Sequence, residues 1–130
     1  MRYPEQLTKE EAIKRHRQLW NYIADESERT GKPVSKKQAF VYFKWSFQTK
    51  SLCWCCEYSC AHCHMCPIEW PDYDGCIWNP ASPYHKLRVA EDSYFTYASD
   101  AYRNPQKAEK CLKDYIKYAR EIANFPERKD

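Results

Sequence analysis

The sequence has little glycine, with only two among its 130 residues, and this scarcity excludes several kinds of protein. Tight β-hairpin turns depend on glycine, so we do not expect a sheet built from many short hairpins. A glycine-rich loop that holds nucleotide phosphates is excluded for the same reason. The two glycines are Gly31 and Gly75, and each lies where the chain is expected to stop or bend.

Long apolar runs are also missing. No stretch approaches the roughly 20 apolar residues of a membrane span, and the first residues, M-R-Y-P-E-Q-L-T, lack the apolar core of a signal peptide. We therefore expect a cytosolic protein with no membrane contact. Thiols stay reduced there, and clustered cysteines more often hold metal than form disulfides. A disulfide-rich secreted domain is the alternative, but the cysteines crowd into one segment instead of bracing the whole chain.

Cations are absent from the middle of the chain. Residues 53–80 contain four acidic residues and no lysine or arginine, although the formal net charge of the whole chain is +3. Residues 1–52 contain eleven Lys/Arg and six Asp/Glu, and residues 81–130 contain ten and eight. A phosphate backbone would be repelled by the middle segment and attracted weakly by the N-terminal one.

Cysteine, by contrast, is abundant, and seven of the eight cysteines lie between Cys53 and Cys76. Cys53 with Cys56, and Cys63 with Cys66, form two C-x-x-C pairs. Each pair directs two thiolates toward one point, and two pairs supply the four soft anionic ligands that tetrahedral zinc takes. We therefore predict one zinc ion bound by these four cysteines, with Cys76 as a fifth candidate ligand that replaces one of them.

Other ligand sets stay open in this segment. Cys55, Cys60, His62 and His64 are spare donors, and a second metal is conceivable because seven cysteines and one histidine make eight ligands. An iron–sulfur cluster also takes four cysteines. A shell made only of cysteine is closed, so we interpret the site as structural and predict no enzyme activity. The deaminase signature is absent, because no glutamate follows His62 at the required spacing.

Two N-terminal helices are expected. A capping box from Thr8 to Glu11 predicts a helix to about Thr30, with Gly31 as its left-handed end. Its apolar stripe contains His16, which we interpret as a packed histidine. A second helix is expected over roughly 36–45 after a cap at residue 35, although V-Y-F-K-W-S-F alternates in part and a strand is the competing prediction.

Two further helices are expected after the cysteine-rich segment. Ser82-Pro83 is a typical helix start, and apolar residues recur at helical spacing to about Arg103, with weak helix formers at 93–97. Asn104-Pro105 repeats this start and predicts a last helix over 106–124. Its apolar stripe includes Cys111, which we interpret as a small core residue.

These elements predict an all-α domain of three or four helices with a central, loop-rich lobe held together by zinc. The whole chain, 1–130, is expected to be one domain with a helical pair at 1–50, the metal lobe at 51–82 and a second pair at 83–126. The lobe has too little aliphatic content to fold alone. Metal binding supplies on the order of 10 kcal/mol at structural zinc sites.

The metal lobe is also the expected partner surface. It carries three tryptophans and two aspartates in an acidic setting, and so fits a basic protein partner. The residues predicted to bind the partner are Trp54, Trp70, Asp72, Asp74 and Trp78. The alternative is that Trp70 and Trp78 pack over the metal-bound sulfurs and exclude water.

Several stretches resemble small cysteine-rich zinc-knuckle proteins of tailed phages and prophages. They are K-E-E-A-I-K-R-H-R-Q-L-W-N-Y-I-A-D-E near the start, C-x-x-C-E-Y at 53–58, C-x-x-C-P-I-x-W at 63–70, and A-R-E-I-A-N-F-P at 119–126. The resemblance implies a phage-borne accessory protein whose knuckle cysteines are Cys53, Cys56, Cys63 and Cys66, with Cys76 matching a further one. The short spacer and the additional Cys55 and Cys60 depart from that pattern.

The expected function is that of a non-enzymatic zinc-binding accessory protein in the cytoplasm of the host cell. We expect it to bind a host or phage protein, and inhibition of a host defence or host enzyme is one form of that role. The alternative is nucleic-acid binding by the basic N-terminal helices, through Arg15, Arg17, Lys36, Lys37 and Lys44. A metal-dependent nuclease is a third class, which chelator-sensitive cleavage would reveal.

Overall fold

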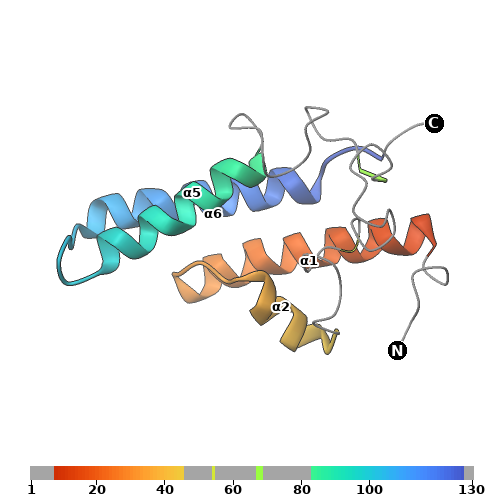
Figure 1. The fold of residues 1–130 in the computed structure, drawn as a ribbon, viewed down its shortest axis with the longest axis horizontal. Helices are drawn as coiled ribbons and strands as arrows, with labels where there is room; N and C mark the ends of the chain where they lie inside the picture. Colours follow the sequence, from red (N-terminus) through yellow and green to blue (C-terminus); the bar gives the residue numbers. More distant parts are fainter. Residues whose placement is uncertain (1–7, 46–53, 55–66, 69–82, 128–130) are drawn as a thin grey trace.

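The computed structural model describes residues 8–45, 54, 67–68 and 83–127, and this part of the chain is all-α (Figure 1). Its helices are α1 (Lys9–Thr30), α2 (Lys36–Phe43), α5 (Pro83–Ala98) and α6 (Pro105–Ala123). Within these ranges the β-pairing consists of one isolated antiparallel bridge between Ile68 and Glu127. The predicted fold class is thus confirmed as all-α, while the predicted zinc-held lobe falls outside the described residues.

The helices form an elongated bundle (Figure 1). α5 and α6 make an antiparallel hairpin, and α1 lies along α6, as Figure 1 shows. Polar contacts fix the antiparallel order of α1 and α6: His16 Nε2 donates to the Ile122 carbonyl at 3.0 Å, and Arg120 Nη1 is 3.0 Å from Asp25 Oδ1. α2 leaves the end of α1 and packs against it. The buried His16 therefore holds two helices together, as expected of a packed histidine.

α1 begins and ends where its local sequence predicts. The Thr8 hydroxyl accepts a hydrogen bond from the Glu11 backbone N–H at 3.1 Å, which satisfies one of the free donors of the first turn. At the other end Gly31 adopts φ 77°, and its N–H donates to the Ser27 carbonyl at 3.0 Å. Only glycine takes this left-handed conformation without a steric penalty, so the helix stops there.

α2 is a helix, so the competing strand interpretation is wrong. Ser35 and Gln38 form a complete capping box: the Ser35 hydroxyl accepts from the Gln38 N–H, and the Gln38 side chain accepts from the Ser35 N–H. The helix ends at Phe43, slightly before the predicted end. Lys44 adopts φ 60°, and its N–H turns back to the Val41 carbonyl.

α5 is shorter than predicted, because it ends at Ala98 and not near Arg103. The hydroxyl of Thr96 donates to the Asp92 carbonyl, and that of Ser99 donates to the Thr96 carbonyl. Such side-chain bonds compete with the helical backbone pattern. α6 then begins at Pro105, with the Asn104 side chain accepting from the Lys107 N–H at 3.1 Å, so the predicted cap is confirmed.

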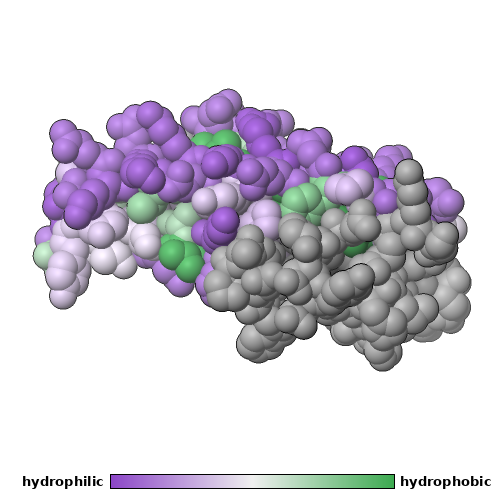
Figure 2. Space-filling model, turned by 90° about the horizontal axis from the view of Figure 1, so that it is seen from above, coloured by the Kyte–Doolittle hydropathy of each residue, from purple (hydrophilic) through white to green (hydrophobic). Residues whose placement is uncertain are grey.

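The core lies between α1, α5 and α6. Small residues let α1 and α6 approach closely, and larger side chains fill the space beside them. The buried apolar residues of these helices are Ala12, Ile13, Leu19, Trp20, Ile23, Ala24, Tyr84, Leu87, Ala90, Ala108, Tyr115, Ala119, Ile122 and Ala123. Figure 2 shows hydrophilic residues over most of the described part of the face seen from above. The sequence predicts Cys111 within the core. Its side chain is only half-buried, so it lies at the edge of the core.

Candidate functional site

The predicted metal ligands lie outside the described residues. This applies to Cys53, Cys56, Cys63, Cys66 and Cys76, and to the spare donors of the same segment. The same holds for four of the predicted partner-binding residues, namely Trp70, Asp72, Asp74 and Trp78. Among the described residues, no three His, Cys, Asp or Glu side chains are grouped to hold a metal ion. The zinc site therefore stays a prediction from the cysteine spacing.

Two points of the cysteine-rich segment are nevertheless seen in the helical core. Trp54, which directly follows Cys53, is 6 % exposed and belongs to the core cluster. Ile68, two residues after Cys66, is completely buried and pairs with Glu127 through the β-bridge. The immediate neighbours of both predicted knuckles are thus attached to the helices. This attachment joins the middle of the chain to the bundle.

Trp54 belongs to an aromatic cluster with α2. Its ring is parallel to that of Phe40, with centroids 5.9 Å apart and an interplanar angle of 9°, and it meets the Trp45 ring edge-on at 5.2 Å. The Arg15 guanidinium carbon lies 4.4 Å from the Trp54 ring centroid, in a cation–π contact. The sequence predicts Trp54 on an exposed contact surface. The structure corrects this prediction. The ring packs against Phe40, Trp45 and Arg15 in the core, because burial of a large apolar ring is favourable, and it is therefore not available to a partner.

Three of the five basic residues of the predicted nucleic-acid surface have contacts within the domain. Arg15 pairs with Glu11 at 3.0 Å and covers Trp54, and Arg17 donates to the Phe125 carbonyl at 3.2 Å. The Lys36 ammonium donates to the Tyr84 hydroxyl and lies over the Tyr84 ring. These three cations thus have structural roles within the domain, and Lys37 of α2 and Lys44 at its end remain exposed.

The outward side of α2 is apolar and basic. Val41 and Tyr42 are 64 % and 62 % exposed, and they are flanked by Lys37 of the same helix and by Lys44, which follows its end. The Tyr42 ring stacks on Tyr22 of α1, with centroids 4.3 Å apart, so it is held in place even though it faces water. We call Lys37, Val41, Tyr42 and Lys44 the α2 face. The sequence indicates only Lys37 and Lys44 here, as part of a basic patch, because helical spacing does not show which side of a helix is covered.

A pocket of about 260 Å³ lies between the start of α2 and the other three helices. Residues from all four helices, together with the α2 cap, line it: Trp20, Ser35, Lys36, Lys37, Tyr84, Leu87, Arg88, Glu91 and Tyr115. We call this the interhelical pocket. Sequence reasoning missed it, because its lining residues are far apart in the chain and carry no motif.

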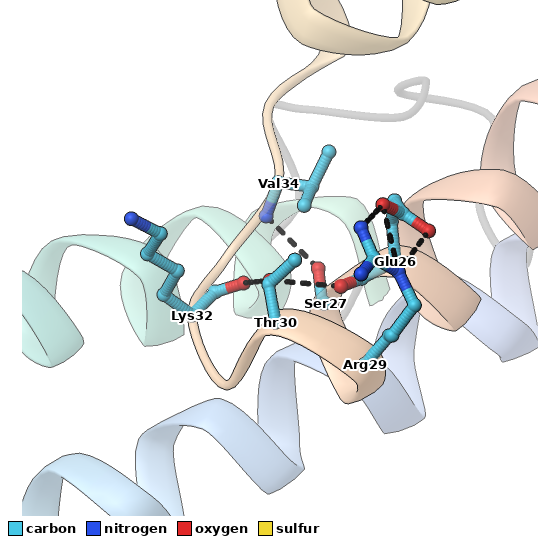
Figure 3. A network of polar contacts seen from close by, with 6 residues as sticks. All are labelled: Glu26, Ser27, Arg29, Thr30, Lys32 and Val34. Atoms are coloured by element: carbon cyan, nitrogen blue, oxygen red, sulfur yellow. Dashed lines mark hydrogen bonds and ion pairs between the residues drawn. The ribbon is translucent and has the colours of Figure 1, made fainter.

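The connection between α1 and α2 sets the shape of this pocket. The buried Ser27 hydroxyl accepts from the Val34 N–H at 2.9 Å, as Figure 3 shows. The Tyr115 hydroxyl donates to the Val34 carbonyl at 2.6 Å. Burial raises the pKa of Tyr115 far above its ordinary value, so this phenol stays protonated and keeps donating. Both backbone groups of Val34 are therefore bonded to the bundle, which fixes where α2 begins.

Glu91 is the acidic residue of the pocket. Burial raises the pKa of its carboxyl, and the charge of Asp92 raises the pKa further, while Arg88 and Lys36 lower it. The cations beside Glu91 thus offset only part of the desolvation cost. Among the described residues that line the pocket, three are cations and one is a carboxylate, so this part of the lining is positively charged.

Comparison of the chain with protein-family models, with curated proteins and with solved structures finds no match. None of the helices in the described ranges has the length and apolar character needed to cross a membrane. The functional reading therefore depends on the residues and contacts described above.

Proposed function

We propose that this protein is a non-enzymatic, zinc-binding accessory protein of phage type that binds a host or phage protein. The observation that carries the proposal is the exposed α2 face, where Val41 and Tyr42 are 64 % and 62 % exposed between two lysines. Apolar and aromatic side chains fixed on a surface are typical centres of protein interfaces. Inhibition of a host defence or host enzyme is one form that such binding takes.

The partner that fits the α2 face is acidic. Lys37 and Lys44 form no ion pair with a described carboxylate, so their charges are available to a partner. Steering between a basic face and an acidic partner speeds association, and the apolar centre supplies affinity. This differs from the acidic segment around Trp70, which would select a basic partner and stays a second proposed contact.

Nucleic-acid binding is the alternative, and the contacts of the basic residues weigh against it. Phosphate binding requires cations that face outward along one surface. Arg15, Arg17 and Lys36 are instead bonded within the domain. Two lysines of α2 are few for a nucleic-acid surface, whereas they suit the rim of a protein interface.

The test is a capture experiment with matched variants of the full chain. We expect Val41→Asp to abolish capture of a specific protein from bacterial host lysate, because the new charge is buried at the centre of the interface. Val89→Asp is the control, since Val89 of α5 is similarly exposed at 51 % but lies on another helix. Nuclease treatment of half of each sample should leave capture unchanged.

The outcomes separate the hypotheses. Capture that survives Val41→Asp, or that Val89→Asp abolishes equally, would contradict an interface on α2. Capture that nuclease removes would favour the nucleic-acid alternative. Double reversal with Lys37→Glu and Lys44→Glu should slow association with the captured protein, and its effect should shrink at high salt.

A further inference from the structure

We propose that the interhelical pocket binds a small organic anion with a flat apolar body and one carboxylate or phosphate group. The described residues that line the pocket do not include Val41 and Tyr42, which form the apolar centre of the α2 face. The described lining residues belong to the four helices and to the α2 cap. The inference goes beyond the proposed function, because a small-molecule site does not follow from protein binding.

The walls of the pocket fit a flat apolar group. Trp20, Tyr84 and Tyr115 supply aromatic surface and Leu87 adds an aliphatic side. Trp20 and Tyr84 meet edge to face, with centroids 5.6 Å apart at 72°, so each ring holds the other in place. The volume of about 260 Å³ lies just below the usual range for drug-sized ligands, about 300–1,000 Å³, and so suits a molecule with a single ring.

The charges of the pocket select an anion. Lys36, Lys37 and Arg88 line it, and Glu91 is the acidic lining residue. Arg88 is exposed and forms no ion pair with a described carboxylate, so its planar guanidinium is available to a carboxylate or phosphate. Lys36 is fixed at the wall by its bond to the Tyr84 hydroxyl. An anion would thus balance the excess of cations among the described lining residues.

The pocket is preformed and does not depend on a movement to close it. The hydrogen bonds of Val34 to Ser27 and Tyr115 hold the start of α2 beside α5 and α6. The capping box of Ser35 fixes the first turn, which carries Lys36 and Lys37. Groups held in place before binding lose little conformational entropy on binding, so even a small ligand gains useful affinity.

The test is a titration of the full, metal-containing chain followed by backbone amide NMR. Phenyl phosphate and benzoate are the probes, because they present the two anionic groups on the same ring. We expect at least one to cause saturable shifts at Ser35, Leu87 and Arg88 at about 10 mM, where a millimolar site is mostly filled. Binding of phenyl phosphate alone would identify a phosphate ester, and binding of benzoate alone a carboxylate. Inorganic phosphate and phenol should each bind at least about tenfold more weakly, because phosphate lacks the apolar ring and phenol lacks the anionic group.

Two substitutions with opposite expected effects test the charge argument. Arg88→Gln should weaken binding about tenfold, since it removes a charge-assisted contact. Glu91→Gln should strengthen binding, because it removes the opposing carboxylate. Lys14→Gln is the matched control: Lys14 is an exposed cation of α1 that does not line the pocket, and its loss should leave binding unchanged.

The proposal is overturned if neither probe causes saturable shifts at the pocket, or if Arg88→Gln and Lys14→Gln reduce binding equally. It is also overturned if inorganic phosphate binds as tightly as phenyl phosphate, because attraction by net charge would then suffice. Circular dichroism of the variants checks that all are folded. Arg88 is not part of the α2 face and Val41 does not line the pocket, so the results for Arg88→Gln and Val41→Asp are independent of each other, although Lys37 belongs to both places.

Discussion

Ser27 shows how one small polar residue sets the position of a whole helix. It lies in α1 and is fully buried, and its hydroxyl accepts from the Val34 N–H at 2.9 Å (Figure 3). A buried backbone N–H without an acceptor loses its hydrogen bond to water and gains nothing in return. Ser27 therefore determines where the chain turns from α1 into α2.

We predict that Ser27→Ala destabilises the protein by about 1–3 kcal/mol, because the Val34 N–H loses its acceptor in a buried site. Urea unfolding followed by circular dichroism measures the change. Thr30→Ala is the control, since Thr30 donates to the Glu26 carbonyl at 2.8 Å from an exposed position, and its loss should cost no more than about 0.5 kcal/mol. Equal effects of the two substitutions would show that the buried hydrogen bond of Ser27 contributes no more to stability than the exposed one of Thr30.

At the scale of elements, the packing of α1 on α6 depends on small side chains. Ala24 of α1 and Ala119 of α6 are completely buried. Alanine lets two helix backbones come close, and it leaves no room for a longer side chain without displacement. The polar bonds between the two helices, such as that of His16 to the Ile122 carbonyl, depend on this close approach.

We predict that Ala119→Leu destabilises the domain by about 1–3 kcal/mol, because the added carbon atoms overpack the contact of the two helices. The comparison is Glu121→Leu, an exposed position of α6 with no described ion pair, where the change should stay within about 0.5 kcal/mol. Thermal unfolding of both variants measures the difference. A Glu121→Leu protein as unstable as Ala119→Leu would indicate a general effect of leucine on α6.

At the scale of the whole molecule, the cysteine-rich segment and the helical bundle are joined through Trp54 and Ile68. Both side chains lie in the core, and each is next to or near a cysteine of a predicted knuckle. If a metal orders that segment, then metal binding also holds these two side chains in the bundle. Folding of the helices and binding of the metal are then linked.

We predict that the purified protein contains close to one equivalent of zinc, and that a chelator lowers the free energy of unfolding of the helices by about 3 kcal/mol or more, the usual cost of losing a large buried side chain. Elemental analysis and urea unfolding measure the two quantities. In a Trp54→Ala variant the chelator should have a smaller effect, because the link through Trp54 is already lost. Two equivalents of zinc would contradict the single site, and removal of zinc without loss of stability would contradict the linkage.

The sequence by itself determined the helices and their starts, because these depend on neighbouring residues. Thr8, Ser35 and Asn104 each cap the helix that follows them, and Gly31 ends α1 through a conformation that favours glycine. The end of α5 was predicted too late, because side-chain bonds of Thr96 and Ser99 compete with the helix and leave no periodic signal.

Only the tertiary structure decided which side of each helix is covered, because burial depends on residues far apart in the chain. The aromatic and acidic composition of its segment predicts Trp54 on a contact surface, whereas packing with Phe40 and Arg15 makes it a core residue. The α2 face is exposed for the converse reason, since the described helices do not pack over Val41 and Tyr42. The interhelical pocket is likewise lined by residues of four helices that are far apart in the chain, so no local sequence pattern predicts it.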